Sequence, residues 1–301
     1  MWLEIQIFGF RALWSPYFFL FLISVAIIYF IITGPKRHLF GNVPKPTLKQ
    51  QFMFYFAIVL IYLVKGSPID LMSHIMMTAH MIQMSILFFV VPIFIIRGLP
   101  NWLLETIIEL PIVKPIFRIF THPIIALAIF NSFFTLYHLP VIFDFSKNSQ
   151  LIHAAINIFL FITVIFMWWP IITPLKAHNK MNPLLKMAYL IASMFIVSIA
   201  CVLMIFASKP LYVTYTSEGA WMQALSLCVP TSVLTGISSH LSGAEMFSPL
   251  TAQEDQQLGG IVMMFLQQIF YGIVIARIFF SWFSKKSMEV DPMPDSLPYE
   301  K

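Results

Sequence analysis

Residues 70–85, DLMSHIMMTAHMIQMS, place two histidines, five methionines and an aspartate inside an almost wholly apolar stretch. On a helix, which turns by about 100° per residue, both histidines, the aspartate and three of the methionines share about a third of the circumference. Neutral imidazole binds several transition metals, and thioethers select Cu(I). This shared face predicts a row of metal-binding side chains. Its residues are Asp70, His74, Met77, His80, Met81 and Met84. Methionines that merely fill gaps between helices are the alternative interpretation.

Two later apolar segments carry polar side chains at helical spacing. The stripes are Asn131, Thr135 and His138 in one segment and Gln150, His153 and Asn157 in the next. Polar side chains inside membrane spans are costly and usually face the interior of the bundle. We therefore expect the two stripes to meet the histidine face of residues 70–85 around one site, with plain interhelical hydrogen bonding as the alternative.

The donor types indicate copper as the bound ion. Zinc sites more often include cysteine or carboxylate ligands, and Cys201 and Cys228 form no CxxC pair. Haem clamped by two histidines, or by a histidine and a methionine, is the main alternative. The sequence has no Walker loop, GxGxxG or HExxH motif, and we expect a binding protein rather than an enzyme.

The elements that must position these side chains are membrane-spanning helices. Of 301 residues, 59% are hydrophobic and only 10% are charged, against about 25% charged in a soluble domain. Runs long enough to cross a bilayer predict seven spans, near 17–33, 52–64, 71–96, 118–138, 150–173, 184–207 and 260–283. We expect an all-α polytopic bundle over residues 1–284 and a disordered cytoplasmic tail over 285–301. Segments 100–117 and 221–237 are expected to lie at the membrane interface.

The loop charges predict the orientation of the bundle. Lysine and arginine concentrate in cytoplasmic loops, and here they gather in the first, third and fifth loops and the carboxyl-terminal tail. This bias predicts an outside amino terminus and an inside carboxyl terminus. It also accounts for the net charge of +5 without a nucleic-acid partner. His74, His80, His138, His153 and His240 then lie on the extracytoplasmic side.

Four segments resemble the CtaG family, the multi-span bacterial cytochrome c oxidase assembly factors. They are MWLEIQIFGFRALWSPYFFLFLI, SHIMMTAHMIQM, YHLP and DQQLGGIVMM. The resemblance covers nearly the whole chain. It implies a role in maturing a haem-copper oxidase, through its copper centre. Matching the motifs singles out His74, His80, His138, His153 and Asp255. A helix-start role, in which Asp255 complements the helix dipole, is the other interpretation of that aspartate.

The resulting hypothesis is a cell-membrane protein that binds copper on its outer face and passes it to a nascent oxidase subunit. Methionines relay Cu(I) toward His80. Its coordination is completed by His138 and His153, and Asp70 or Asp255 orients an imidazole. The partner subunit docks on the lipid-facing surface, and association of identical copies stays open. A haem-binding electron carrier or oxidoreductase and a copper permease are the alternative functions.

Overall fold

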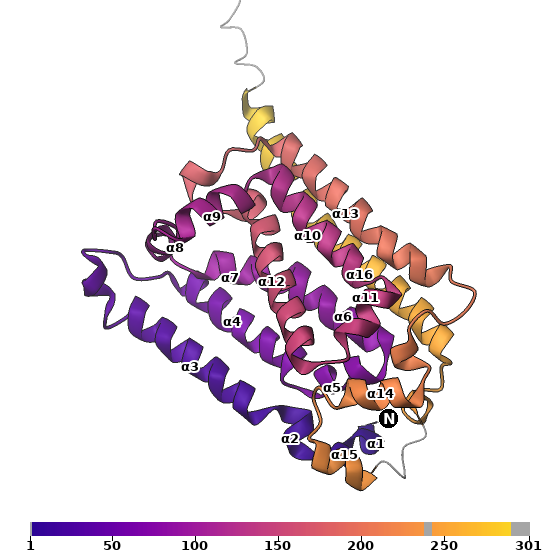
Figure 1. The fold of residues 1–301 in the computed structure, drawn as a ribbon. Helices are drawn as coiled ribbons and strands as arrows, with labels where there is room; N and C mark the ends of the chain where they lie inside the picture. Colours follow the sequence, from indigo (N-terminus) through magenta and orange to yellow (C-terminus); the bar gives the residue numbers. More distant parts are fainter. Residues whose placement is uncertain (1, 238–242, 290–301) are drawn as a thin grey trace, which may run out of the picture.

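The computed structural model describes residues 2–237 and 243–289, which form helices and no strand (Figure 1). The long helices are α3 (Pro16–Thr33), α4 (Leu48–Lys65), α10 (Pro123–Tyr137), α12 (Gln150–Ile172), α13 (Pro183–Ile205) and α16 (Ala252–Glu289). The shorter ones are α1 (Trp2–Ile5), α2 (Gly9–Trp14), α5 (Pro68–Ile75), α6 (Met77–Ser85), α7 (Val91–Gly98), α8 (Asn101–Ile108), α9 (Val113–Phe120), α11 (Pro140–Ser146), α14 (Glu218–Leu225) and α15 (Thr231–Ile237).

Within the described residues, six helical segments are long and apolar enough to cross a membrane. They are Gln6–Thr33, Leu48–Lys65, Met77–Gly98, Gln150–Ile172, Pro183–Ile205 and Ala252–Ser284. A seventh is reached if α9 and α10, which meet at 82°, count as one bent span. The predicted count of seven therefore depends on this bent pair. The all-helical membrane fold is confirmed, and the sidedness of the termini stays a prediction.

Two segments expected at the interface contain short helices. Residues 100–117 hold α8 and the start of α9, and residues 221–237 hold most of α14 and all of α15. Within the described residues no candidate span includes residues 221–237, and their location at the interface stays a prediction. Helix α16 continues to Glu289, five residues past the predicted end of the transmembrane domain. His240 and residues 290–301 of the predicted tail lie outside the described residues.

The prediction of a continuous helix over 71–96 is wrong, because the helix is interrupted at Met76. That residue is extended (φ −134°, ψ 141°) and separates α5 from α6. A π-helical turn, η3 (Ile86–Val90), then leads into α7. The break changes the helical phase between His74 and His80, so the single face predicted for residues 70–85 does not exist as one straight stripe.

A side chain from the last helix stabilises this break. Asp255 on α16 accepts hydrogen bonds from the backbone N–H groups of Met77 (2.6 Å) and Thr78 (3.3 Å), the first two residues of α6. These N–H groups have no partner within their own helix, and a carboxylate there also complements the helix dipole. Gly259 permits the close approach, since a Cβ there would lie 3.2 Å from the backbone of Met77.

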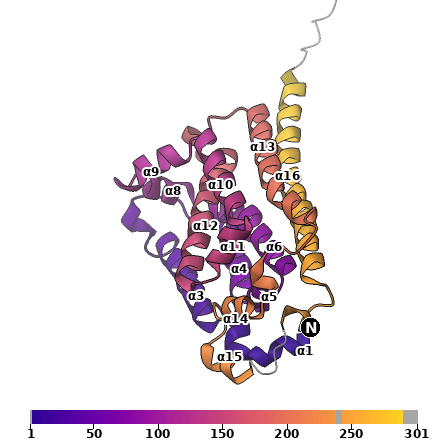
Figure 2. The same cartoon turned by 45° about the vertical axis from the view of Figure 1, so that its right-hand side comes forward.

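The broken third span lies at the centre of the bundle (Figure 2). In its most apolar stretch 67% of the residues are buried, against 17% in the stretches of α3 and of α4. Helices α10, α11 and α12 pack against one another. The end of α10 places His138 beside α6, and α12 places His153 beside α5. Helix α3 has many exposed residues, and most residues of α4 are half-buried.

Candidate metal centre

His80 lies in the middle of α6 with only 1% of its surface exposed. Within the described residues, neither of its ring nitrogens has a hydrogen-bond partner. Its ring lies beside those of Phe143, Tyr137 and His138, at centroid distances of 5.2, 6.0 and 6.2 Å. Buried polar atoms are nearly always hydrogen-bonded, and one without a partner calls for an explanation.

His138, at the carboxyl-terminal end of α10, is fully buried and held in one tautomer. Its Nδ1 lies 2.7 Å from the Phe134 carbonyl oxygen. A carbonyl can only accept, so Nδ1 carries the hydrogen and Nε2 keeps a free lone pair. Nε2 has no hydrogen-bond partner in the described part of the chain. Metal-binding histidines commonly donate their second ring nitrogen to a backbone carbonyl in this way.

His74 and His153 form a second pair, with ring centroids 5.4 Å apart. The Asn157 amide donates to the His153 backbone carbonyl (2.8 Å) and faces its Nε2 (3.2 Å). The amide hydrogen therefore points to Nε2, which leaves the ring hydrogen of a neutral His153 on Nδ1, an atom without a partner among the described residues. As placed, His153 presents an N–H group rather than a free lone pair.

Lys147 lies beside the histidines, although no pattern in the sequence marked it as a site residue. Only 2% of its surface is exposed, and its Nζ lies 3.4 Å from His74 Nδ1 and 5.2 Å from the centroid of the Phe143 ring. No carboxylate of the described residues lies within ion-pair distance. Burial, helped by the charge of Lys65, lowers the pKa of Lys147 to about 7. An amine therefore lies beside the pair of His74 and His153.

The two candidate carboxylates are engaged elsewhere. Asp70 pairs with Lys65 and accepts from the Gln83 amide, both at 2.8 Å. Asp255 holds the start of α6, as described above. Neither carboxylate bonds to an imidazole in the described structure, so the predicted role of orienting a histidine ring finds no contact. Asp255 lies in the first turn of its own helix, α16, but its hydrogen bonds go to the start of α6, a contact that the helix-start interpretation did not predict. Its role as a metal ligand stays a prediction.

The three methionines of the predicted row are all buried. Met77, Met81 and Met84 lie on α6 and have at most 1% of their surface exposed. Met77 and Met84 lie three residues before and four residues after His80, positions that share a helix face. Packing and ligation both remain open for these sulfurs.

The described residues contain no group of three or more histidine, cysteine or acidic side chains arranged to hold a metal ion. The four predicted histidines do come together, as the pairs His80–His138 and His74–His153. They come from four elements: α5, α6, the end of α10 and α12. One histidine of each polar stripe lies beside a histidine of residues 70–85, and their role as metal ligands stays a prediction. Of the two pairs, His80 and His138 can supply two nitrogen donors, a number suited to Cu(I) with added thioethers, whereas His153 as placed presents an N–H group.

Comparison with protein-family models matches residues 18–285 to the family described as cytochrome c oxidase caa3 assembly factor (Caa3_CtaG). No curated protein and no solved structure matches the chain.

Proposed function

The chain belongs to the family of cytochrome c oxidase caa3 assembly factors, and from this we propose that it carries copper, held between His80 and His138, to a nascent oxidase subunit. Membership indicates a multi-pass membrane protein that acts in oxidase assembly together with oxidase subunits. The copper cargo, the residues that hold it and its delivery from the extracytoplasmic side are the added proposal.

One observation carries the proposal: His80 and His138 bury three ring nitrogens that have no partner in the described structure. Burying a polar group without a hydrogen bond costs about 1–3 kcal/mol by mutational measurements. An aromatic residue at position 80 could pack against Tyr137 and Phe143 without that cost. A metal ion would satisfy the orphaned lone pairs and would account for histidine at both positions.

The spacing of the two rings fits a bridging ion. With metal–nitrogen bonds of about 2 Å, two imidazoles that hold one ion between them in a near-linear arrangement have centroids about 6 Å apart. The His80 and His138 centroids are 6.2 Å apart. Met77 and Met84 offer sulfur on the same side of α6, and imidazole with thioether and no thiolate favours copper over zinc.

A carrier must also release its cargo, and the elements over the site suit that task. Tyr212 donates to the His138 carbonyl (2.8 Å) and Tyr215 to the Ser73 carbonyl (3.1 Å). Both tyrosines come from the connection between α13 and α14, which covers the site without being part of a span. We infer that displacement of this connection by the partner subunit opens the copper site.

The proposal is tested by the metal content of the oxidase rather than by its activity alone. Cells that lack this protein would be supplied with the wild-type gene, with His80→Ala or with His122→Ala. His122 is an exposed histidine away from the site and serves as the matched control. We expect the oxidase from His80→Ala cells to keep its haem and to lose most of its copper, with normal copper in the control.

An oxidase with full copper from His80→Ala cells would contradict copper delivery by this residue. Loss of haem with retained copper would favour the haem-binding alternative. A Soret band in the visible absorption spectrum of the purified assembly factor would also support haem binding.

A further inference from the structure

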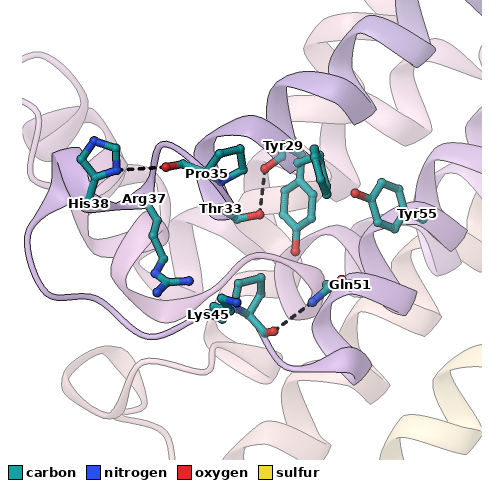
Figure 3. Close-up of a pocket in the computed structure, with 11 residues that line it drawn as sticks. Tyr29, Thr33, Pro35, Arg37, His38, Lys45, Gln51 and Tyr55 are labelled. Atoms are coloured by element: carbon teal, nitrogen blue, oxygen red, sulfur yellow. Dashed lines mark hydrogen bonds between the residues drawn. The ribbon is translucent and has the colours of Figure 1, made fainter.

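A pocket of about 490 Å³ lies between the end of α3 and the start of α4 (Figure 3). This end of α3 is the one far from α2 and α5 (Figure 1). Its walls come from three places: the last turn of α3, the loop over residues 34–47 and the first turns of α4. Its lining includes Tyr29, Phe30, Arg37, Lys45 and Gln51. None of them belongs to the proposed copper site.

The charge of the pocket is positive. Arg37 and Lys45 line it, and no aspartate or glutamate does. Within the described residues, neither cation has an ion pair or a hydrogen-bonded partner for its side chain. A guanidinium and an ammonium that share one pocket without a counter-ion suit a phosphate, which arginine binds through two parallel hydrogen bonds.

Hydrogen bonds hold the pocket in shape without a ligand. The Gln51 amide donates to the Pro46 carbonyl (3.0 Å), which ties the loop to α4, and the Thr47–Gln50 capping box fixes the start of that helix. On the other wall, Tyr29 stacks on Phe54 at a centroid distance of 3.8 Å and donates to the Gly98 carbonyl. A preformed pocket reduces the entropy cost of binding.

The pocket continues onto an apolar surface. Phe30 lines it and is 61% exposed, and Ile27, about one turn earlier on α3, is 51% exposed. Both belong to a candidate membrane span that is largely unburied, so their exposed faces meet lipid tails. The pocket therefore offers positive charge at one end and an apolar surface at the other. A matching ligand has a phosphate group joined to a hydrocarbon chain.

We propose that this pocket binds the headgroup of an anionic phospholipid, with its phosphate on Arg37 and Lys45 and an acyl chain along Phe30 and Ile27. Basic pockets between transmembrane helices are known to bind such headgroups. The bound lipid links α3 to α4, the two least buried spans of the bundle. Its effect is to fasten α3 to the rest of the protein.

The test measures lipid retention and thermal stability of the purified full-length protein. Detergent-solubilised wild type would be mixed with phosphatidylglycerol, phosphatidylcholine or inorganic phosphate. The variant is the double change Arg37→Gln and Lys45→Gln. The control is Lys36→Gln with Lys49→Gln, which removes the same charge from exposed neighbours that do not line the pocket.

We expect phosphatidylglycerol to be retained in native mass spectra and to raise the melting temperature of the wild type and of the control by several degrees. The Arg37→Gln, Lys45→Gln protein should lose at least about ten-fold in retention and show no shift in melting temperature. Equal responses of variant and control would overturn the proposal. So would equal retention of phosphatidylcholine, or full competition by inorganic phosphate, which would indicate a free-anion site.

Discussion

At the scale of single residues, the orphaned nitrogens of His80 and His138 are the strongest sign of function. Lys147 is the least expected neighbour, because a buried ammonium beside His74 opposes a cation. It also costs stability, since burial disfavours its charged form.

Replacing Lys147 with methionine should stabilise the protein in a pH-dependent way. The pKa of Lys147 is lowered from 10.5 to about 7 in the folded protein. Between these two pH values the lysine is protonated in the unfolded chain and neutral in the folded protein. The stability of the wild type therefore rises with pH across this window. The cost of the buried charge is therefore complete below about pH 7. We expect Lys147→Met to melt several degrees above the wild type near pH 6.5, with a difference that shrinks toward pH 10.

Melting curves of both proteins across this pH range check the prediction. Lys180→Met, which removes an exposed lysine far from the site, is the control and should change little. A stability gain that is independent of pH would show that Lys147 does not lose its proton in this window.

Sulfur ligation is separated from packing by Met84→Leu. Swaps that conserve volume usually cost less than about 1.5 kcal/mol, so the melting temperature should hold. If the sulfur contacts copper, Cu(I) affinity should fall about ten-fold. Met72→Leu, in α5 and outside the predicted face, is the control. Unchanged affinity in Met77→Leu, Met81→Leu and Met84→Leu alike would leave all three as packing residues.

At the scale of elements, the break between α5 and α6 depends on α16. Asp255→Ala removes the acceptor for two backbone N–H groups at a helix start, where loss of one cap costs about 0.5–2 kcal/mol. We expect a lower melting temperature and weaker copper binding, because His80 lies only three residues after the first residue of α6. Asp255→Asn, which keeps one acceptor oxygen, should recover part of the stability.

The close approach of α16 gives an independent test of the same contact. A Cβ on Gly259 would lie 3.2 Å from the α6 backbone, whereas one on Gly272 would meet nothing within 4 Å. Gly259→Ala should therefore destabilise the protein, while Gly272→Ala should be neutral or stabilising, since alanine is the better helix former. Equal effects of the two changes would mean that α16 does not press on α6.

The sequence predicts some of these elements and not others, for physical reasons. Apolar runs such as 150–173 and 184–207 locate α12 and α13 because crossing a bilayer needs only length and hydropathy. The polar stripes likewise predict that His80 and His138 meet. The break at Met76 has no local signal, since no proline or glycine marks it and its cause, Asp255, lies 178 residues from Met77. The burial of Lys147 depends on how α11 folds back, which the polar segment KNSQ does not reveal.

At the scale of the whole molecule, the predicted orientation decides whether copper is delivered from outside. Asn148 follows α11 beside the histidine sites, and Ala177 lies in the connection between α12 and α13, and both are exposed. In a background without Cys201 and Cys228, a cysteine at position 148 should react with a membrane-impermeant thiol reagent in intact cells. A cysteine at position 177 should react only after permeabilisation. The reverse pattern would place the histidines in the cytoplasm and exclude delivery from outside.

The central claim, that His80 and His138 hold copper together, is tested most directly by competitive Cu(I) titration of the purified protein. Wild type, His80→Ala, His138→Ala and the His122→Ala control would be compared, with melting temperatures measured alongside. The account predicts that the first two variants lose affinity by at least about ten-fold at a nearly unchanged melting temperature, while the control binds as the wild type does. Wild-type affinity in both His80→Ala and His138→Ala would contradict it.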